Sequence, residues 1–137
     1  MVTGPVLQQV VLDAVDTRPL AEFYRRLLDL RYRDGDQPPV DGASDDADWL
    51  VLLDHEGRRV LAFQQADELT PTTWPSPKVP MQAHLDLTVP DRESLDAAHE
   101  RALDLGARLL SDQSDDPEEQ LYVYADPAGH PFCIFVA

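Results

Sequence analysis

The feature that most constrains this chain is an internal repeat, in which one strand–helix pattern is written twice. With the sequence displaced by a constant number of positions, the segment Val10–Leu30 lies over Leu85–Leu105. A turn of the form Asp-x-x-Gly also repeats between apolar runs, at Asp54–Gly57 and at Asp126–Gly129. Each copy reads strand, helix, short strand, strand, turn, strand, and is longer than a solenoid repeat. The repeat therefore predicts one pseudo-symmetric α+β domain made of two tandem βαβββ modules.

The second copy carries a complete set of signals for where its strand and helix begin and end. Asp91 can cap a helix over residues 92–105, and Gly106 can end that helix in a left-handed conformation. In the strand before it, polar and apolar residues alternate with the period of two that a half-buried strand requires. The polar face of that strand consists of His84, Asp86 and Thr88, and the apolar face of Leu85, Leu87 and Val89.

The module boundaries follow from the repeat and from the composition between the copies. We expect the first module at about residues 6–66, a linker at about 67–80 and the second module at about 81–137. Four prolines predict a stiff, extended linker that crosses between the two halves, in which Trp74 either pins the linker to the core or walls a pocket. The loop at residues 34–48 is interpreted as a mobile connection or as a lid over a cleft. The remaining strands are expected at residues 7–14, 31–33, 49–53 and 59–65, and at 107–111, 121–125 and 131–136.

Composition excludes several classes of function. The formal net charge of −15 argues against a nucleic-acid partner, because phosphates would be repelled. That charge either keeps the protein soluble or favours capture of a cationic ligand. No apolar run is long enough for a membrane span, and the start of the chain has no signal-peptide pattern. Cys133 is the single cysteine, so no internal disulfide can form, and a reducing cytoplasm is the expected location.

Functional residues are expected where the strands of the two modules combine. Neither module has enough sheet to enclose a core alone, so we expect the two to form a cupped mixed sheet around a cleft. Polar residues predicted to face inward are Gln9, either Gln64 or Gln65, His84 and Cys133, while aromatic walls are expected from Trp49, Phe63, Trp74 and Tyr122. His99 lies beside the apolar stripe of its helix and is interpreted as a packing residue.

Several motifs, taken in order, resemble one known superfamily. These are LAFQ at Leu61–Gln64, TWPSP at Thr73–Pro77 and DPAGHPFC at Asp126–Cys133, together with the order of the modules. The chain resembles the glyoxalase / bleomycin-resistance / extradiol-dioxygenase (vicinal oxygen chelate) superfamily, and most closely its bacterial glyoxalase-like branch. The resemblance implies paired βαβββ modules, often completed in a homodimer. It also implies that metal-dependent members bind a divalent ion at positions that correspond here to Gln9, Gln64, His84 and Cys133.

These residues form a poor site for such an ion. The resemblance implies glutamate on the fourth and eighth strands, where this chain has Gln64 and Cys133, so the negative charge that neutralises the ion is lacking. We therefore predict a small-molecule-binding protein with no cofactor and no catalytic metal, which sequesters an aromatic or cationic compound. The alternative is a metal-dependent lyase, isomerase or dioxygenase whose ion is bound by Gln9 and His84, with Gln64 as a further candidate ligand.

Overall fold

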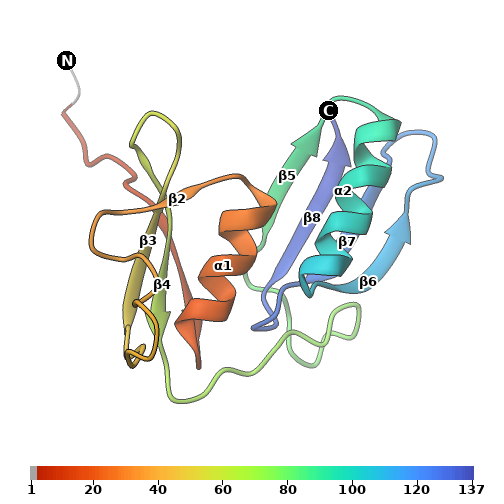
Figure 1. The fold of residues 1–137 in the computed structure, drawn as a ribbon. Helices are drawn as coiled ribbons and strands as arrows, with labels where there is room; N and C mark the ends of the chain where they lie inside the picture. Colours follow the sequence, from red (N-terminus) through yellow and green to blue (C-terminus); the bar gives the residue numbers. More distant parts are fainter. Residues whose placement is uncertain (1–2) are drawn as a thin grey trace. The chain divides into compact units, whose positions relative to one another are not determined.

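The computed structural model of the chain describes residues 3–137 and divides them into two compact units, one ending at Asp67 and the other running from Glu68 to Ala137. Each unit contains one helix and one four-stranded mixed sheet (Figure 1). The predicted α+β class with two βαβββ modules is therefore confirmed. Within residues 3–137, none of the helices has both the length and the apolar character that crossing a membrane requires.

The first unit has the strand order β1-β4-β3-β2. Strand β1 runs parallel to β4, whereas the other neighbours are antiparallel. Helix α1 covers one face of this sheet, where the ring of Tyr24 stacks on that of Phe63 at a centroid distance of 6.1 Å. The elements are β1 (Val10–Ala14), α1 (Thr17–Leu27), β2 (Arg31–Tyr32), β3 (Trp49–Leu53) and β4 (Arg59–Gln65).

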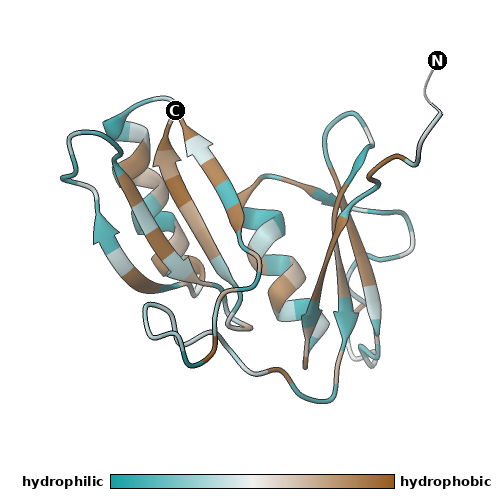
Figure 2. Cartoon of the chain, turned by 180° about the vertical axis from the view of Figure 1, so that it is seen from behind, coloured by the Kyte–Doolittle hydropathy of each residue, from teal (hydrophilic) through white to brown (hydrophobic). Residues whose placement is uncertain are grey.

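The second unit repeats this topology, with the strand order β5-β8-β7-β6 and β5 parallel to β8. Strand β8 is hydrophobic along most of its length, whereas its neighbour β5 alternates between hydrophobic and hydrophilic residues (Figure 2). The shared topology is the structural counterpart of the sequence repeat. The elements are β5 (Leu85–Val89), α2 (Arg92–Leu105), β6 (Arg108–Gln113), β7 (Leu121–Ala125) and β8 (Pro131–Val136).

Helix α2 begins and ends where its sequence signals predict. The carboxylate of Asp91 accepts a hydrogen bond of 2.8 Å from the backbone N–H of Ser94, which satisfies one of the free donors at the helix start. Gly106 ends the helix with φ of 114°, a conformation that a residue with a Cβ atom adopts only at a cost. The strand and helix of this module are thus specified locally as well as by packing.

Part of the linker, from Thr72 to Val79, is not extended, contrary to the prediction. It belongs to the second unit and folds back on itself, because the hydroxyl of Thr72 donates to the carbonyl of Val79 at 2.9 Å and the N–H of Thr73 donates to the same carbonyl at 2.9 Å. The hydroxyl of Thr73 also accepts a bond from the N–H of Val79. The prolines therefore shape a compact loop, and Trp74 lies half-buried within it.

The loop from residue 34 to residue 48 is tied to α1 by polar contacts. Thr17 donates to the carbonyl of Ala47 at 2.6 Å, and Arg18 donates to the carbonyl of Asp36 at 2.6 Å. The guanidinium of Arg18 also pairs with the carboxylate of Asp45 at 2.8 Å. These contacts fix both arms of the loop against the first turn of the helix.

Candidate functional site

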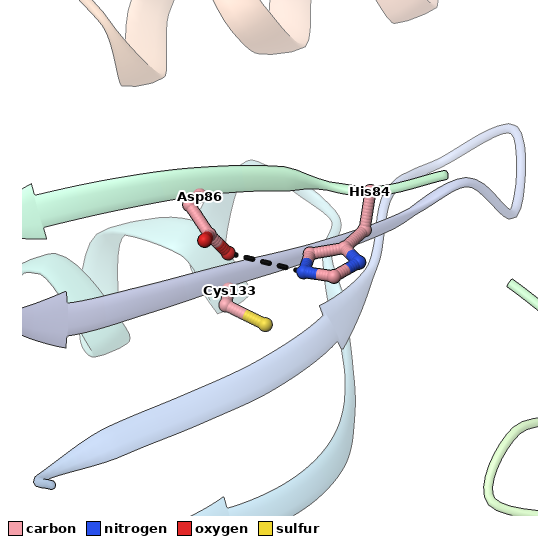
Figure 3. A group of neighbouring side chains, drawn as sticks. All are labelled: His84, Asp86 and Cys133. Atoms are coloured by element: carbon pink, nitrogen blue, oxygen red, sulfur yellow. Dashed lines mark ion pairs between the residues drawn. The ribbon is translucent and has the colours of Figure 1, made fainter. Parts of the chain in front are cut away.

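Three side chains that carry metal-ligating or proton-transferring groups converge on one face of the second sheet. His84 directly precedes β5, Asp86 lies on β5, and Cys133 lies on β8 as the register partner of Asp86 (Figure 3). The Nε2 atom of His84 lies 3.1 Å from the Oδ1 atom of Asp86. The ligand atoms of all three residues lie within 4.8 Å of one another. We call this group the His84–Asp86–Cys133 cluster.

The strand period explains why these residues meet. Side chains two apart on a strand point to the same face, so His84 and Asp86 share one face. The register of the parallel pair β5–β8 then places Cys133 directly beside Asp86. Since the two residues are 47 positions apart in number but adjacent in the sheet, only the pairing of the strands brings them together.

The face that carries the cluster is the one opposite α2. The other face packs on α2, because the hydroxyl of Tyr124 lies 2.7 Å from Nδ1 of His99 and the ring of Tyr122 stacks on the His99 imidazole at 3.9 Å. The register of the strands gives three rows on the face opposite α2. One row, Pro131, Ala125 and Arg108, contains an arginine, whereas the other two contain neither lysine nor arginine. These two rows are Asp86, Cys133, Val123 and Ser111, and Thr88, Phe135, Leu121 and Gln113.

Burial and charge act together on the thiol of the cluster. Cys133 is half-buried, and this burial raises the pKa of its thiol to about 11, with a further contribution from the negative charges of Asp86 and Glu119. A thiol with this pKa is protonated at neutral pH and is therefore not an activated nucleophile. His84 and Asp86 are both exposed, with 40% and 57% of their side chains accessible, so the cluster is open to solvent.

Of the two glutamines considered on the fourth strand, Gln64 is the one on the face of the sheet that points away from α1. The side chain of Gln64 points to the opposite face from that of its neighbour Phe63, and its amide N–H donates to Oδ1 of Asp13 at 3.1 Å. Trp49 is the register partner of Gln64, so the side chains of these two residues leave the sheet on the same face. The side chain of Gln65, the next residue on β4, lies on the opposite face. The Oε1 atom of Gln9 is buried and has no hydrogen-bond partner among residues 3–137.

Two of the predicted aromatic wall residues belong to the cores of their modules. Phe63 is fully buried against Tyr24 of α1, and Tyr122 is buried against His99 of α2. Their packing against a helix accounts for both rings. The interpretation of His99 as a packing residue agrees with this arrangement.

Asp86 is the residue that sequence reasoning missed. The alternation that places His84 on one face of the strand places Asp86 on the same face, and that signal was available from the sequence alone. The resemblance implies acidic ligands on the fourth and eighth strands, whereas Asp86 lies on the fifth. The parallel pairing of Asp86 with Cys133 then requires the structure.

The two modules differ at the positions of the cluster. Val11 pairs with Ala62 in the first module as Asp86 pairs with Cys133 in the second, and Gln9 matches His84. Three matching positions therefore hold one neutral amide and two apolar residues in the first module, but three metal-ligating groups in the second. The same register gives Phe135, rather than Cys133, as the counterpart of Gln64.

Comparison with known proteins identifies a family whose model matches most of the chain. The family model described as "Glyoxalase-like domain" matches residues 9–135. A comparison with curated proteins gave no match. Among solved structures, a glyoxalase/bleomycin resistance protein/dioxygenase family enzyme from Burkholderia phytofirmans shares 16% identity with a TM-score of 0.66, over 94% of this chain and 96% of its own.

Two fosfomycin resistance proteins have a similar fold. FosX from Mesorhizobium loti shares 15% identity with a TM-score of 0.65, over 100% of this chain and 94% of its own. A FosX mutant from Listeria monocytogenes, in complex with Mn(II) and a dihydroxypropylphosphonic acid, shares 17% identity with a TM-score of 0.68, over 100% of this chain and 94% of its own. At these sequence identities, the similarity shows a shared fold and nothing further.

Proposed function

Because the chain belongs to the glyoxalase-like domain family, within the vicinal oxygen chelate superfamily, we propose that it binds a small organic cation with an aromatic or apolar body. The observation that carries the proposal is the face of the second sheet opposite α2. On that face the exposed carboxylate of Asp86 lies beside Cys133 and near the partly exposed apolar residues Phe135 and Leu121, and the two rows that contain these residues have no basic side chain. An acidic group beside an apolar surface is suited to a cation that also carries hydrophobic surface.

The proposed binding does not use the divalent metal that the resemblance implies for enzymes of the superfamily. Ions such as Mn²⁺ prefer carboxylate oxygens, but the positions implied as glutamates hold the neutral amide of Gln64 and the thiol of Cys133. Gln64 is engaged with Asp13, and the first-module counterpart of Cys133 is Ala62, which has no donor atom. The residues present do not fit this metal set.

Charge supports the same class of ligand. A formal net charge of −15 attracts cations at long range, and this attraction weakens as salt shortens the screening distance to about 8 Å at physiological ionic strength. At the site itself, an ammonium or amidinium N–H can donate to Asp86, while the apolar body of the ligand covers Phe135. Both contributions predict that a cation binds more tightly than a neutral compound of the same shape.

The experiment is a thermal-shift and tryptophan-fluorescence screen with matched cationic, neutral and anionic aromatic compounds. A ligand present at 100 times its Kd should add about 2.7 kcal/mol to the free energy of unfolding. Asp86→Asn should weaken cation binding by about 1 kcal/mol, or roughly fivefold, because it removes the ion pair between the bound cation and the partly exposed carboxylate of Asp86.

Asp29→Asn is the matched control. Asp29 also lies 3.2 Å from a histidine, His55, but neither residue belongs to the proposed face. Equal effects of the two variants would contradict the assignment of Asp86. Stoichiometric manganese, iron or nickel that is lost on Gln9→Ala would instead support the metal-dependent enzyme.

Two further features of the proposal concern the setting of the protein. We propose a cytoplasmic location, since Cys133 is the only cysteine and is free, as a reducing compartment permits. We also propose a homodimer, by the resemblance to the superfamily. Light scattering coupled to size-exclusion chromatography tests the second point, and a monomeric mass at micromolar concentration would contradict it.

A further inference from the structure

We propose that the His84–Asp86–Cys133 cluster is a binding site for a borderline-soft divalent ion, with Zn²⁺ as the ion that its donors fit best (Figure 3). The site lies wholly within the second module. It shares His84 and Cys133 with the positions that the superfamily implies, and it adds Asp86, which is absent from that set. The site shares Asp86 with the proposed site for an organic cation, so the two ligands would compete, and each proposal is tested with its own ligand.

The donor atoms are of the types that zinc takes in proteins. One imidazole nitrogen, one carboxylate oxygen and one sulfur converge, and zinc binds such donors at roughly 2.0–2.3 Å in a tetrahedral arrangement. Donors at those bond lengths lie about 3.5 Å from each other. The His84 and Asp86 donors are already 3.1 Å apart, and the full cluster spans no more than 4.8 Å. Small side-chain rotations therefore suffice, and both residues are exposed enough to make them.

The charges of the cluster also match the ion. Asp86 supplies one negative charge, and binding of the ion to the Cys133 sulfur releases the thiol proton to solvent and leaves a second. The two negative charges neutralise Zn²⁺. Three protein ligands leave a fourth position for water or a small anion, as in zinc sites that are open to solvent.

The internal repeat shows that the fold does not require these donors. The matching positions of the first module hold Gln9, Val11 and Ala62, which together offer one neutral oxygen. A strand pair of this topology is thus compatible with apolar residues at two of the three positions. The second module has a ligating group at all three positions.

The presence of sulfur predicts which ions bind. Mg²⁺ and Mn²⁺ prefer oxygen ligands and near-octahedral geometry, which one carboxylate beside a thiolate does not provide. Zn²⁺ and its spectroscopic substitute Co²⁺ accept nitrogen and sulfur in tetrahedral sites. We therefore expect binding of Zn²⁺ and Co²⁺ in preference to Mg²⁺ and Mn²⁺.

The test uses the full chain, freed of metal with a chelator that is then removed by dialysis. Calorimetric titration with Zn²⁺ should show one equivalent, and titration with Co²⁺ should produce a thiolate-to-cobalt charge-transfer absorption. Cys133→Ser should abolish that absorption and weaken Zn²⁺ binding by at least about tenfold, and His84→Ala and Asp86→Asn should also weaken it by about tenfold. Circular dichroism and thermal melting establish that each variant is folded.

His55→Ala is the matched control, because His55 forms another exposed histidine–carboxylate pair, 3.2 Å from Asp29, and should leave zinc binding unchanged. Zinc binding that survives Cys133→Ser, or that is lost on His55→Ala, would overturn the proposal, as would cobalt binding without a charge-transfer band. Since the titration uses metal alone, its failure leaves the binding of organic cations untouched, and failure of the ligand screen leaves the zinc site untouched.

Discussion

Glu22 links α1 to the edge strand β2, and its carboxylate provides a sharp test of the energetics of the first module. It accepts a hydrogen bond of 3.0 Å from Nη2 of Arg25 and one of 2.7 Å from the hydroxyl of Tyr32. The bond from Arg25 is the largest cause that lowers the pKa of Glu22, to about 2 from an ordinary value of 4.5, with a further contribution from Tyr32. The guanidinium of Arg18 lies 4.9 Å from the centre of the Tyr32 ring and completes the group.

The size of the effect follows from that shift. At about 1.4 kcal/mol for each pKa unit, a shift from 4.5 to about 2 corresponds to an upper limit of roughly 3.5 kcal/mol. A quarter of the Glu22 side chain is exposed, at 24%, so solvent screening reduces the expected contribution to about 1–2 kcal/mol. Glu22→Gln keeps the shape of the side chain and its ability to accept a bond from Tyr32, but removes the charge. We expect this variant to lose about 1–2 kcal/mol of unfolding free energy at pH 7.

The pH dependence of the unfolding free energy tests the sign of the Glu22 contribution. Because the pKa of Glu22 is depressed in the folded state, its contribution is complete above about pH 4.5 and is lost as the pH falls through about 2. Urea denaturation at pH 7, 5, 4 and 3 should therefore show a constant gap between wild type and Glu22→Gln down to about pH 5 and a shrinking gap below it. Glu100→Gln, at an exposed position of α2, is the control for general charge effects. An unchanged gap between pH 5 and pH 3, or none at pH 7, would refute the reasoning.

Two further predictions concern the second module, each with a control at the matching position of the first. Asp91→Ala should cost about 1 kcal/mol in urea denaturation because it removes the cap of α2, whereas Asp16→Ala should cost much less, since Asp16 makes no side-chain capping bond. Gly129→Ala should lower the melting temperature more than Gly57→Ala: both glycines have positive φ, but only at Gly129 would a Cβ atom collide with Pro71. Equal losses in either pair would contradict the structural explanation.

The local signals of the second module are the part of the fold that the sequence predicts best. Asp91 and Gly106 act at the helix ends where their chemistry indicates, because capping depends on a few neighbouring atoms. The part of the linker from Thr72 to Val79 was predicted incorrectly, because its shape depends on contacts between residues six and seven positions apart. Its prolines favour extension, but the hydrogen bonds that join Thr72 and Thr73 to Val79 close it into a loop, and such bonds depend on the path of the whole segment.

The predicted binding residues divide according to the strand period. Phe63 and Gln64 are neighbours on β4, and a period of two places them on opposite faces, so both could not line one surface. The structure places Phe63 in the core and Gln64 on the face away from α1. Strict use of the alternation would have excluded Phe63 and selected Asp86. The adjacency of Asp86 and Cys133 depends on strand order and register, which no local pattern determines.

The repeat also limits how the cluster can be interpreted. If His84, Asp86 and Cys133 served only to stabilise the sheet, the same strand pair in the first module would be expected to show comparable polar groups, but Val11 and Ala62 occupy the matching positions of the last two. Exposure gives the same answer, since the half-exposed ion pair of His84 and Asp86 contributes at most about 1 kcal/mol to stability. Neither packing nor ion pairing therefore accounts for three convergent donors on this face. Each of the two proposals would account for them by a ligand, which is an organic cation held by Asp86 in one and a metal ion held by all three residues in the other.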